Sequence, residues 1–546
     1  MATLNFKGKS FVQNHHLSVK YHQLVPKKDK SLTDKVSLND NLIIHGDNLI
    51  ALKALLPTYA GKVKCIYIDP PYNTGNEKWV YNDNVNSPMM QEWLGKVVDK
   101  EDFTRHDKWL CMVMPRLKLL KELLRDDGII FISIDENEQQ RLRLLMEEIF
   151  NDNHIVTFAW TGRSGKGGTT TQVEMNHEYI ECFGKVFNKV NIKPVTRIQP
   201  EGKYRDKQGS YSRERLRQWG QGDRREDRPR MYFPIPTPDG GEAYPIRPDG
   251  SEGRWRFGEG TVFKMLENDD LDFEKNGKGI WEVFRKIRAG QERISAADSL
   301  LDAVGTASSG TIELKRIFNG KKVLETVKPS SLIKHLIDLA TWEDKNAIIL
   351  DSFAGSGTTA HAVLDLNNED GGNRKFILVE CEDYANKITA ERVRRVIKGV
   401  KTAKDEKLKK GLGGTFSYFE LGEPIEMESI LEGKKLPDYM ELARYIFYTA
   451  TGEEFNPSKV KQSKNFIGET KDYEVYLFYE PDIEKLKKLA LTLDTAKKLG
   501  SFTGKKRLVF APAKYLDLND ADLIDKHGLK GIEYCQLPFE IYKMRG

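Results

Sequence analysis

The sequence has few cysteines and no pattern that would use them. Five occur among 546 residues, at positions 65, 111, 182, 381 and 535. None forms a C-x-x-C pair or joins histidines at ligand spacing, so we expect no structural zinc, no other metal and no disulfide framework. Apolar runs long enough to cross a membrane are also missing, and Met1 to Ser10 lacks the apolar core of a signal peptide. We therefore predict a protein of the reducing cytoplasm with no membrane partner.

A strong charge of one sign is missing as well. Lysine and arginine together number 86, against 81 aspartate and glutamate residues, which gives a formal net charge of +5. A field this weak cannot by itself attract nucleic acid, so any such affinity must come from clustered charge. The length predicts about two to four domains with a substantial buried core.

What the sequence does contain is the tetrapeptide Asp69-Pro70-Pro71-Tyr72, directly after the apolar run Val63 to Ile68. The run predicts a buried strand. Two consecutive prolines fix the backbone and remove two donors, which leaves the Asp69 carboxylate and the Pro70 carbonyl as fixed acceptors. Acceptors beside the flat ring of Tyr72 suit a flipped-out base with an exocyclic amine. A turn with an N-capping aspartate would explain the tetrapeptide equally well.

A second strand, which ends in a glycine turn, decides between these interpretations. Ala347 to Leu350 are apolar, and the turn that follows has glycines at 355 and 357. At the carboxyl end of a parallel strand, such a turn lets the backbone approach a nucleotide-like ligand closely. It is neither a Walker loop nor a complete dinucleotide fingerprint. The next strand, Lys375 to Val379, ends in Glu380, where a carboxylate can hold ribose hydroxyls. The two strands predict an adenosine-type cofactor without a pyrophosphate.

The two motifs, in this order, resemble those of the amino-methylating DNA methyltransferases that use S-adenosyl-L-methionine. Four further segments resemble the modification subunits of type III restriction-modification systems: Asn48 to Gly75, Arg228 to Ile235, Gly253 to Arg256 and Lys328 to Ile333. This resemblance covers most of residues 36–400. It implies a bacterial or archaeal N6-adenine methyltransferase acting on double-stranded DNA, a homodimer, and a separate helicase-nuclease chain that cleaves. The chain is somewhat short for that group, which leaves room for a solitary methyltransferase.

Alternating apolar strands and helices predict an α/β fold, a doubly wound and mostly parallel sheet of the Rossmann-like methyltransferase type. The motif order requires this sheet to be assembled from two chain segments, 40–190 and 325–400. Residues 1–39 are polar and lysine-rich and are predicted to form an arm. Residues 411–546 follow a lysine-rich linker, and we predict a C-terminal α+β domain for assembly or dimerisation.

Between the two segments, residues 191–324 lack apolar periodicity and are rich in arginine, glycine, proline and aromatic residues. For most single charges here, a solvated and partly self-paired surface is the better interpretation. As a region, however, the insertion is predicted to face DNA, because arginine suits guanine edges and phosphates and aromatic rings can stack. In the resembled family a target-recognition domain occupies this place. The predicted DNA-binding residues are Arg213, Arg215, Arg217, Arg224, Arg225, Arg228, Arg230 and Trp255.

The resemblance also implies roles around the cofactor. Asp351 would hold the methionine ammonium, Glu380 the ribose hydroxyls and Asp47 the adenine. Lys328 and Ser330 match the segment at the methionine carboxylate. The close backbone wall would consist of Phe353, Ala354, Gly355, Gly357 and Thr358. Considered without the resemblance, the three carboxylates could instead cap helices, and Lys328 could be a surface residue.

The predicted mechanism depends on charge at the amine. The catalytic residues would be Asp69, Pro70, Pro71 and Tyr72. If Asp69 and the Pro70 carbonyl accept both amine protons, the nitrogen is drawn toward tetrahedral geometry and its developing positive charge is stabilised. In the resembled family an initial aspartate favours adenine over cytosine. The alternatives are an N4-cytosine methyltransferase, an RNA or protein-amide methyltransferase, and a catalytically silent DNA-binding subunit.

Overall fold

The structure is a computed structural model that describes residues 3–74, 105–162, 175–403, 405–424, 436–486, 488–500, 502–516, 518, 524–525, 527 and 529–537. The chain divides into two compact units, which are described separately below. One combines Met1–Lys193 with Asp298–Gly546, and the other is Pro194–Ala297. No helix among the described residues is both long and apolar enough to cross a membrane.

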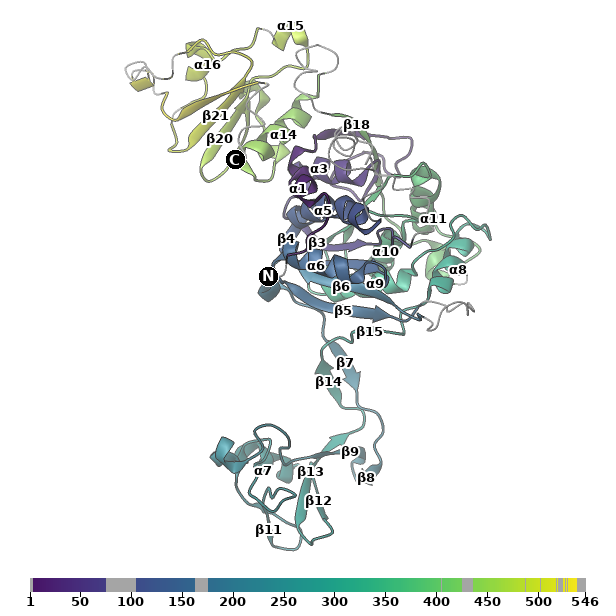
Figure 1. The fold of residues 1–546 in the computed structure, drawn as a ribbon. Helices are drawn as coiled ribbons and strands as arrows, with labels where there is room; N and C mark the ends of the chain where they lie inside the picture. The colour runs from purple at the N-terminus through teal and green to yellow at the C-terminus, as the bar shows by residue number, and fades with distance from the viewer. Residues whose placement is uncertain are drawn as a thin grey trace. The chain divides into compact units, whose positions relative to one another are not determined.

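The centre of the first unit is a sheet of ten strands (Figure 1). In spatial order they are β1 (His22–Pro26), β18 (Ser417–Pro424), β2 (Leu42–His45), β17 (Lys375–Glu380), β16 (Ile348–Asp351), β3 (Val63–Ile68), β4 (Leu124–Ile134), β6 (Glu178–Gly184), β5 (His154–Trp160) and β15 (Leu300–Leu301). Only β1 and β6 run antiparallel to their neighbours. The sheet confirms the prediction of a mostly parallel α/β fold, and its central strands come from two separated segments of the chain.

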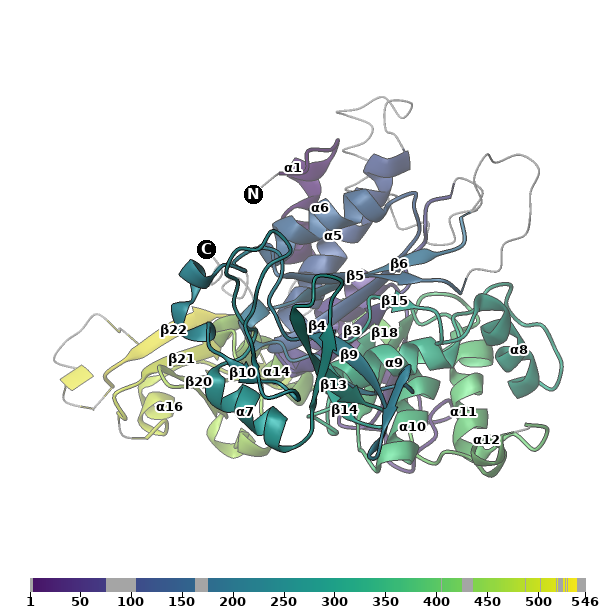
Figure 2. The same ribbon diagram turned by 90° about the horizontal axis from the view of Figure 1, so that it is seen from below.

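Helices cover both faces of this sheet. On one side lie α3 (Asn48–Tyr59), α5 (Arg105–Leu123) and α6 (Gln139–Phe150), which share one core, and on the other α9 (Ser330–Thr341), α10 (Thr358–Asp370) and α11 (Glu391–Lys398). Figure 2 shows α5 and α6 apart from α9, α10 and α11. All six residues of β3 are buried, as expected for a strand with helices on both faces. Ile66 and Ile68 join the core shared with α3 and α5, whereas Cys65 and Tyr67, which alternate with them, point to the opposite face.

The structure draws the domain boundaries differently from the sequence prediction at three places. Strand β1 lies in the predicted arm 1–39 but pairs with β18, and β18 lies in the predicted C-terminal domain 411–546 but pairs with β2. Residues 298–324, assigned to the insertion, belong to the first unit, where they supply β15 and α8 (Ala307–Ile317). Each of these strands is short, and its partner is remote in sequence, so local patterns carried no sign of the pairing.

The second unit has its own core and its own sheet. Strands β8 (Tyr204–Asp206), β9 (Gly209–Arg215), β13 (Trp281–Arg288) and β12 (Leu271–Lys275) are antiparallel neighbours in that order. Two smaller pairs are β7 (Val195–Ile198) with β14 (Glu292–Ser295), and β10 (Ile235–Pro236) with β11 (Glu242–Ala243). Helix α7 (Glu259–Glu267) supplies Val262 to a core that also contains Phe233 and Trp255.

The C-terminal part of the first unit carries a separate four-stranded sheet. Its strands are β19 (Phe466–Glu469), β20 (Tyr473–Leu477), β21 (Lys506–Ala511) and β22 (Ile532–Gln536), and the last three are parallel. The accompanying helices are α14 (Tyr439–Thr451), α15 (Ile483–Leu486) and α16 (Leu493–Lys497). Tyr445 of α14 contacts Tyr21, with ring centroids 4.6 Å apart, so this part packs on the N-terminal segment.

Candidate active site

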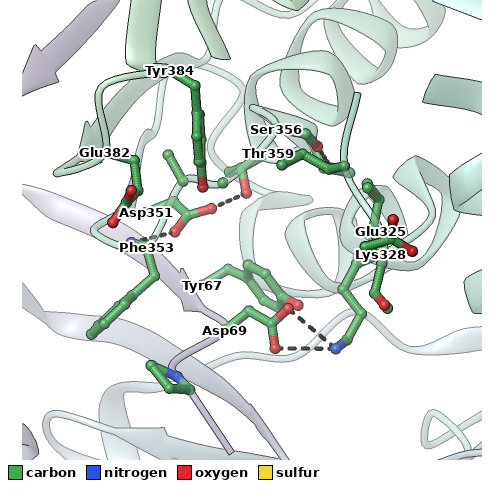
Figure 3. Close-up of a pocket in the computed structure, with 17 residues that line it drawn as sticks. Tyr67, Asp69, Glu325, Lys328, Asp351, Phe353, Ser356, Thr359, Glu382 and Tyr384 are labelled. Atoms are coloured by element: carbon green, nitrogen blue, oxygen red, sulfur yellow. Dashed lines mark hydrogen bonds and ion pairs between the residues drawn. The ribbon is translucent and has the colours of Figure 1, made fainter. Parts of the chain in front are cut away.

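The ends of β3 and β16 open into one cavity of about 550 Å³ (Figure 3). These strands are parallel neighbours, so their carboxyl ends lie at the same edge of the sheet. Eight of the predicted site residues line the cavity: Asp69, Pro71, Lys328, Asp351, Phe353, Ala354, Gly355 and Thr358. The structure therefore brings together two motifs that are about 280 residues apart in the sequence.

The turn after β16 needs its glycines. Gly355 and Gly357 have φ angles of +52° and +80°, a region that side chains with a Cβ rarely adopt. A Cβ on Gly357 would also lie 3.1 Å from the Thr389 carbonyl oxygen. The turn leads directly into α10, and Gly355, Ser356 and Thr358 around this junction line the cavity.

Asp351 is a buried carboxylate at the floor of the cavity. It accepts hydrogen bonds from the Phe353 backbone N–H at 3.0 Å and from the Thr359 hydroxyl at 2.5 Å. Burial nevertheless raises the pKa of Asp351 to about 7, and the charge of Asp69 acts in the same direction. A cationic group that entered the cavity would lower the pKa of Asp351 and so favour the ionised carboxylate that accepts its hydrogen bonds.

Glu380 serves the glycine turn. Its carboxylate accepts the Gly355 N–H at 2.6 Å and the Glu382 N–H at 3.0 Å, and burial raises its pKa to about 7. Glu382 and Tyr384, two and four residues further on, line the cavity, whereas Glu380 does not. The sequence predicted correctly that this strand ends at Glu380, but it did not show that Glu382 is the carboxylate on the cavity wall.

Three other predicted cofactor residues, Asp47, Ser330 and Gly357, are not among the residues that line the cavity. Asp47 caps α3, accepting the Ile50 N–H at 3.1 Å, and lies 3.4 Å from the Arg116 guanidinium. Ser330 begins α9, and its hydroxyl donates to Glu313. The role of Asp47 is the helix-capping alternative that the sequence left open, and contact of Asp47 or Ser330 with a cofactor stays a prediction.

The Asp69 carboxylate is at the centre of a tight polar cluster. The Lys328 ammonium lies 3.1 and 3.2 Å from its two oxygens, and the Tyr72 hydroxyl lies 2.8 Å from Oδ1. Lys328 also donates to the Tyr72 hydroxyl at 2.5 Å. The Trp109 indole N–H, 2.7 Å from the Pro71 carbonyl, holds the proline segment in place, and Pro70 is buried.

Glu178 is a member of this cluster that the sequence analysis missed. Its Oε2 lies 3.1 Å from the Tyr72 hydroxyl and 3.2 Å from the Lys328 ammonium. Burial alone would lower the pKa of Lys328, but the carboxylates of Asp69 and Glu178 outweigh burial and raise it, so the ammonium stays charged. Glu178 is the first residue of the antiparallel strand β6, and only the pairing of that strand brings it here.

A buried arginine supports the glycine turn from behind. The Arg392 guanidinium donates to the hydroxyls of Ser356 and Thr358, at 2.7 and 2.8 Å, and pairs with Glu313 at 3.0 Å. Burial lowers the pKa of Arg392. Glu313 also accepts from Ser330, so one carboxylate links α8, α9 and α11 behind the cavity.

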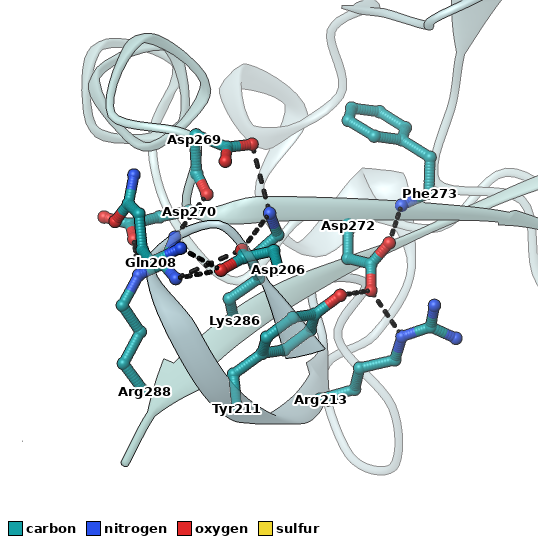
Figure 4. A network of polar contacts seen from close by, with 10 residues as sticks. All are labelled: Asp206, Gln208, Tyr211, Arg213, Asp269, Asp270, Asp272, Phe273, Lys286 and Arg288. Atoms are coloured by element: carbon teal, nitrogen blue, oxygen red, sulfur yellow. Dashed lines mark hydrogen bonds and ion pairs between the residues drawn. The ribbon is translucent and has the colours of Figure 1, made fainter. Parts of the chain in front are cut away.

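In the second unit, several predicted DNA-binding arginines are engaged within the protein. Arg213 lies 2.6 Å from Asp272, Arg215 2.8 Å from Glu282, and Arg225 2.7 Å from Glu252. Arg217 is buried. A neighbouring network joins Asp206 to Lys286 and Arg288 (Figure 4). Arg224, Arg228 and Arg230 are exposed, and no salt bridge to them is found in the part of the chain that the structure describes.

Trp255 corrects the prediction of an aromatic DNA contact. Only 1% of it is exposed, and its indole N–H donates to the Phe233 carbonyl at 2.8 Å. A ring buried in the core of its own unit cannot stack on a base. Trp219 of this unit is 70% exposed, and Trp281 is partly exposed.

Residues 63–391 match the N6/N4-type family model described as DNA methylase. The chain belongs to this family of DNA methyltransferases. It is 31% identical over 475 residues to the EcoPI Mod subunit of Escherichia phage P1, a type III restriction-modification enzyme, covering 79% of this chain and 73% of that one. It is 34% identical to the type II methyltransferase M.KpnI of Klebsiella pneumoniae, covering 64% of this chain and 82% of that one.

Further similarity extends to the StyLTI Mod subunit of Salmonella typhimurium, 32% identical over 69% of this chain and 57% of that one. Among solved structures, the chain is similar to the PvuII DNA methyltransferase (cytosine-N4-specific), with 12% identity, a TM-score of 0.33, and coverage of 64% and 86%. As a member of its family, this DNA methyltransferase uses S-adenosyl-L-methionine. Within the described residues, no group of histidine, cysteine or acidic side chains could hold a metal ion.

Proposed function

We propose that this chain transfers a methyl group from S-adenosyl-L-methionine to the exocyclic N6 of an adenine flipped out of double-stranded DNA. The observation that carries the proposal is the shared cavity, in which the Asp69 strand end faces the glycine turn after Asp351. When bound, the cofactor supplies a methyl group that is already activated by its sulfonium. The protein then has to align an amine with that carbon and exclude water.

The residues around the cavity suit this cofactor. Its volume of about 550 Å³ is in the range of small-molecule sites. The buried Asp351 carboxylate can take an ammonium, and the backbone of Ala354 and Gly355 allows close approach. We assign the ribose hydroxyls to the end of β17, where Glu380 holds the turn and Glu382 lies on the wall.

On the substrate side, Asp69 would accept an amine proton and stabilise the positive charge that develops on the nitrogen. One such preorganised group contributes about 3–4 kcal/mol in comparable sites. Extruding the base costs a few kcal/mol, and stacking on Tyr72 can offset about 1–3 kcal/mol of this. Adenine is favoured over cytosine by the aspartate that opens the tetrapeptide.

We further propose that the chain is the modification subunit of a type III system in a bacterial or archaeal cytoplasm, since three similar proteins are Mod subunits. It would then form a homodimer and join a helicase-nuclease chain, with the C-terminal domain serving assembly and residues 194–297 serving target recognition. M.KpnI, which matches over 82% of its own length, supports a solitary methyltransferase as the second candidate.

Nucleoside mass spectrometry of DNA from an expressing strain tests the proposal. We expect N6-methyladenine that is absent from a strain expressing Asp69→Ala. N4-methylcytosine would overturn the choice of base, and no modified nucleoside in either strain would favour a silent DNA-binding subunit. Co-purification with a helicase-nuclease chain, measured separately, distinguishes a type III subunit from a solitary enzyme.

A further inference from the structure

We infer that Glu178 is a second catalytic carboxylate and that it forms, with Asp69, Tyr72 and Trp160, a cation cage for the target amine, which Lys328 fills in the ligand-free protein. This inference rests on the proposed function and deepens it. In this inference Glu178 of the antiparallel strand β6 contacts the reacting nitrogen. Lys328 occupies the place of the substrate amine until the base enters.

The geometry around the Lys328 ammonium is that of a site built for a cationic nitrogen. Four oxygens lie within 3.2 Å of it: both of Asp69, one of Glu178 and the Tyr72 hydroxyl. Its side chain is only 9% exposed, and that of Glu178 is 13% exposed, so water screens this pairing weakly.

Two aromatic rings complete the cage. The ammonium lies 4.8 Å from the centroid of Tyr72 and 5.6 Å from that of Trp160, within the range in which a ring face attracts a cation. Trp160 is buried, and its indole N–H is held by the Gly305 carbonyl at 3.0 Å. Trp160 and Glu178 are direct partners across β5 and β6, so the sheet register sets both walls together.

Lys328, which occupies the cage, carries the same positive charge that the amine nitrogen gains when the methyl group is transferred. During transfer the amine lone pair forms a bond to the methyl carbon, the carbon–sulfur bond breaks with its electrons staying on sulfur, and the nitrogen becomes positive until one proton leaves for solvent. A nitrogen with positive charge among two carboxylates and two rings is what Lys328 already presents. The cage therefore favours the charged state over the neutral amine, which is how a site accelerates a reaction.

Lys328 must leave before the base can enter, because one set of acceptors cannot hold both nitrogens. Its segment, residues 318–329, has no helix or strand and forms part of the cavity wall. The neutral amine would displace the ammonium, and the two carboxylates would regain a matching positive charge only as charge develops on the nitrogen during transfer.

Chemical rescue tests the cage without any methylation. In Lys328→Ala the cage loses its ammonium, and methylammonium chloride at tens of millimolar should raise the melting temperature by roughly 2–4 °C relative to sodium chloride at equal ionic strength. The wild type should show no such rise, because Lys328 occupies the cage. The double variant Lys328→Ala/Glu178→Gln should lose most of it. An equal response of Lys328→Ala to both salts would overturn the inference.

Lys334→Ala is the matched control. Lys334 also pairs with two carboxylates, Asp365 at 2.7 Å and Glu369 at 2.8 Å, but its side chain is 26% exposed. We expect methylammonium to leave the melting temperature of this variant unchanged. A rescue as large as that of Lys328→Ala would show a general effect of the salt and would count against the cage.

Glu178→Gln tests the catalytic role and remains informative if Lys328→Ala does not fold. Glutamine keeps the size and an acceptor oxygen but removes the charge. We expect the single-turnover methylation rate at saturating DNA and cofactor to fall roughly 10- to 100-fold, with both dissociation constants within about 3-fold of wild type. A rate within about 2-fold of wild type would sink the inference while leaving the proposed function intact. Absence of methylation by the wild type would instead overturn the proposed function. The cation rescue would still test the cage, because it does not depend on methylation.

Discussion

The two units of this protein both hold many ion pairs but place them differently. In the first unit Asp69 and Asp351 line a cavity, and the charges of Asp69 and Glu178 are balanced by a single lysine. In the second unit Asp206 and Asp272 pair with Lys286, Arg288 and Arg213 near the surface. The first arrangement leaves carboxylates that a ligand can take over. In the second arrangement the charged side chains pair with one another within the unit, so arginine content alone is a poor guide to the DNA-binding surface.

Removing one carboxylate from each unit tests this difference between the units with the largest expected effect. Asp69→Ala should lower the single-turnover methylation rate about 1,000-fold or more, because it removes an acceptor that acts on the reacting nitrogen. The matched variant is Asp206→Ala, which strips partners from Lys286 and Arg288. It should lower the melting temperature but not the methylation rate of DNA-bound enzyme. A wild-type rate in Asp69→Ala would place the chemistry elsewhere.

A second test compares a buried tryptophan of the inserted unit with an exposed one. Trp255→Ala should destabilise that unit by about 3–5 kcal/mol, because it empties a fully buried site. Trp219→Ala, at a residue 70% exposed, should leave the unfolding midpoint unchanged. Urea unfolding of the full chain, followed by intrinsic fluorescence, measures both. If Trp255→Ala unfolds like the wild type, that residue does not belong to the core.

The buried carboxylates of the first unit should make its stability depend on pH. Burial raises the pKa of Asp351 from 3.8 to about 7 and that of Glu380 from 4.5 to about 7. Between about pH 4 and 7 the native state therefore binds protons that the unfolded chain has lost, and stability falls as pH rises, by at most about 1.4 kcal/mol per pH unit for each group.

Thermal unfolding of the cofactor-free protein across this range checks the direction. Asp351→Asn should flatten the curve, since asparagine does not titrate. Cofactor binding should release protons near pH 6–7, because an ammonium beside Asp351 favours its ionised form. Stability that rises over the same interval would contradict the assignment.

The prediction with the smallest expected effect compares exposed arginines with an ion-paired one by the salt dependence of DNA affinity. Arg228→Ala and Arg230→Ala should each reduce the slope of log affinity against log salt by about 1, if these exposed residues contact phosphates. Arg213, held by Asp272 at 2.6 Å, is the control, and Arg213→Ala should lower stability while leaving the slope unchanged. DNA titrations at several salt concentrations provide the comparison. A slope change confined to Arg213→Ala would reverse the assignment.

Much of the first unit could be predicted because its signals are local. A strand was predicted at 63–68, and β3 has these bounds. Both motifs combine a strand with a turn whose residue types are dictated by backbone geometry, such as the glycine at φ +80°. Trp255 was assigned to DNA because its neighbours are arginines, whereas its burial depends on residues such as Val283 that are distant in the sequence.

By itself the sequence determined the strand ends, the residues that they carry and the family to which these belong, because strand and turn chemistry is written in adjacent residues. Only the tertiary structure decided which carboxylates share the reacting site. Glu178 reaches Lys328 through the antiparallel pairing of β6, and β1 and β18 join the sheet through partners remote in the chain. Such pairings depend on the complete sheet, and no short stretch of residues contains the information that sets them.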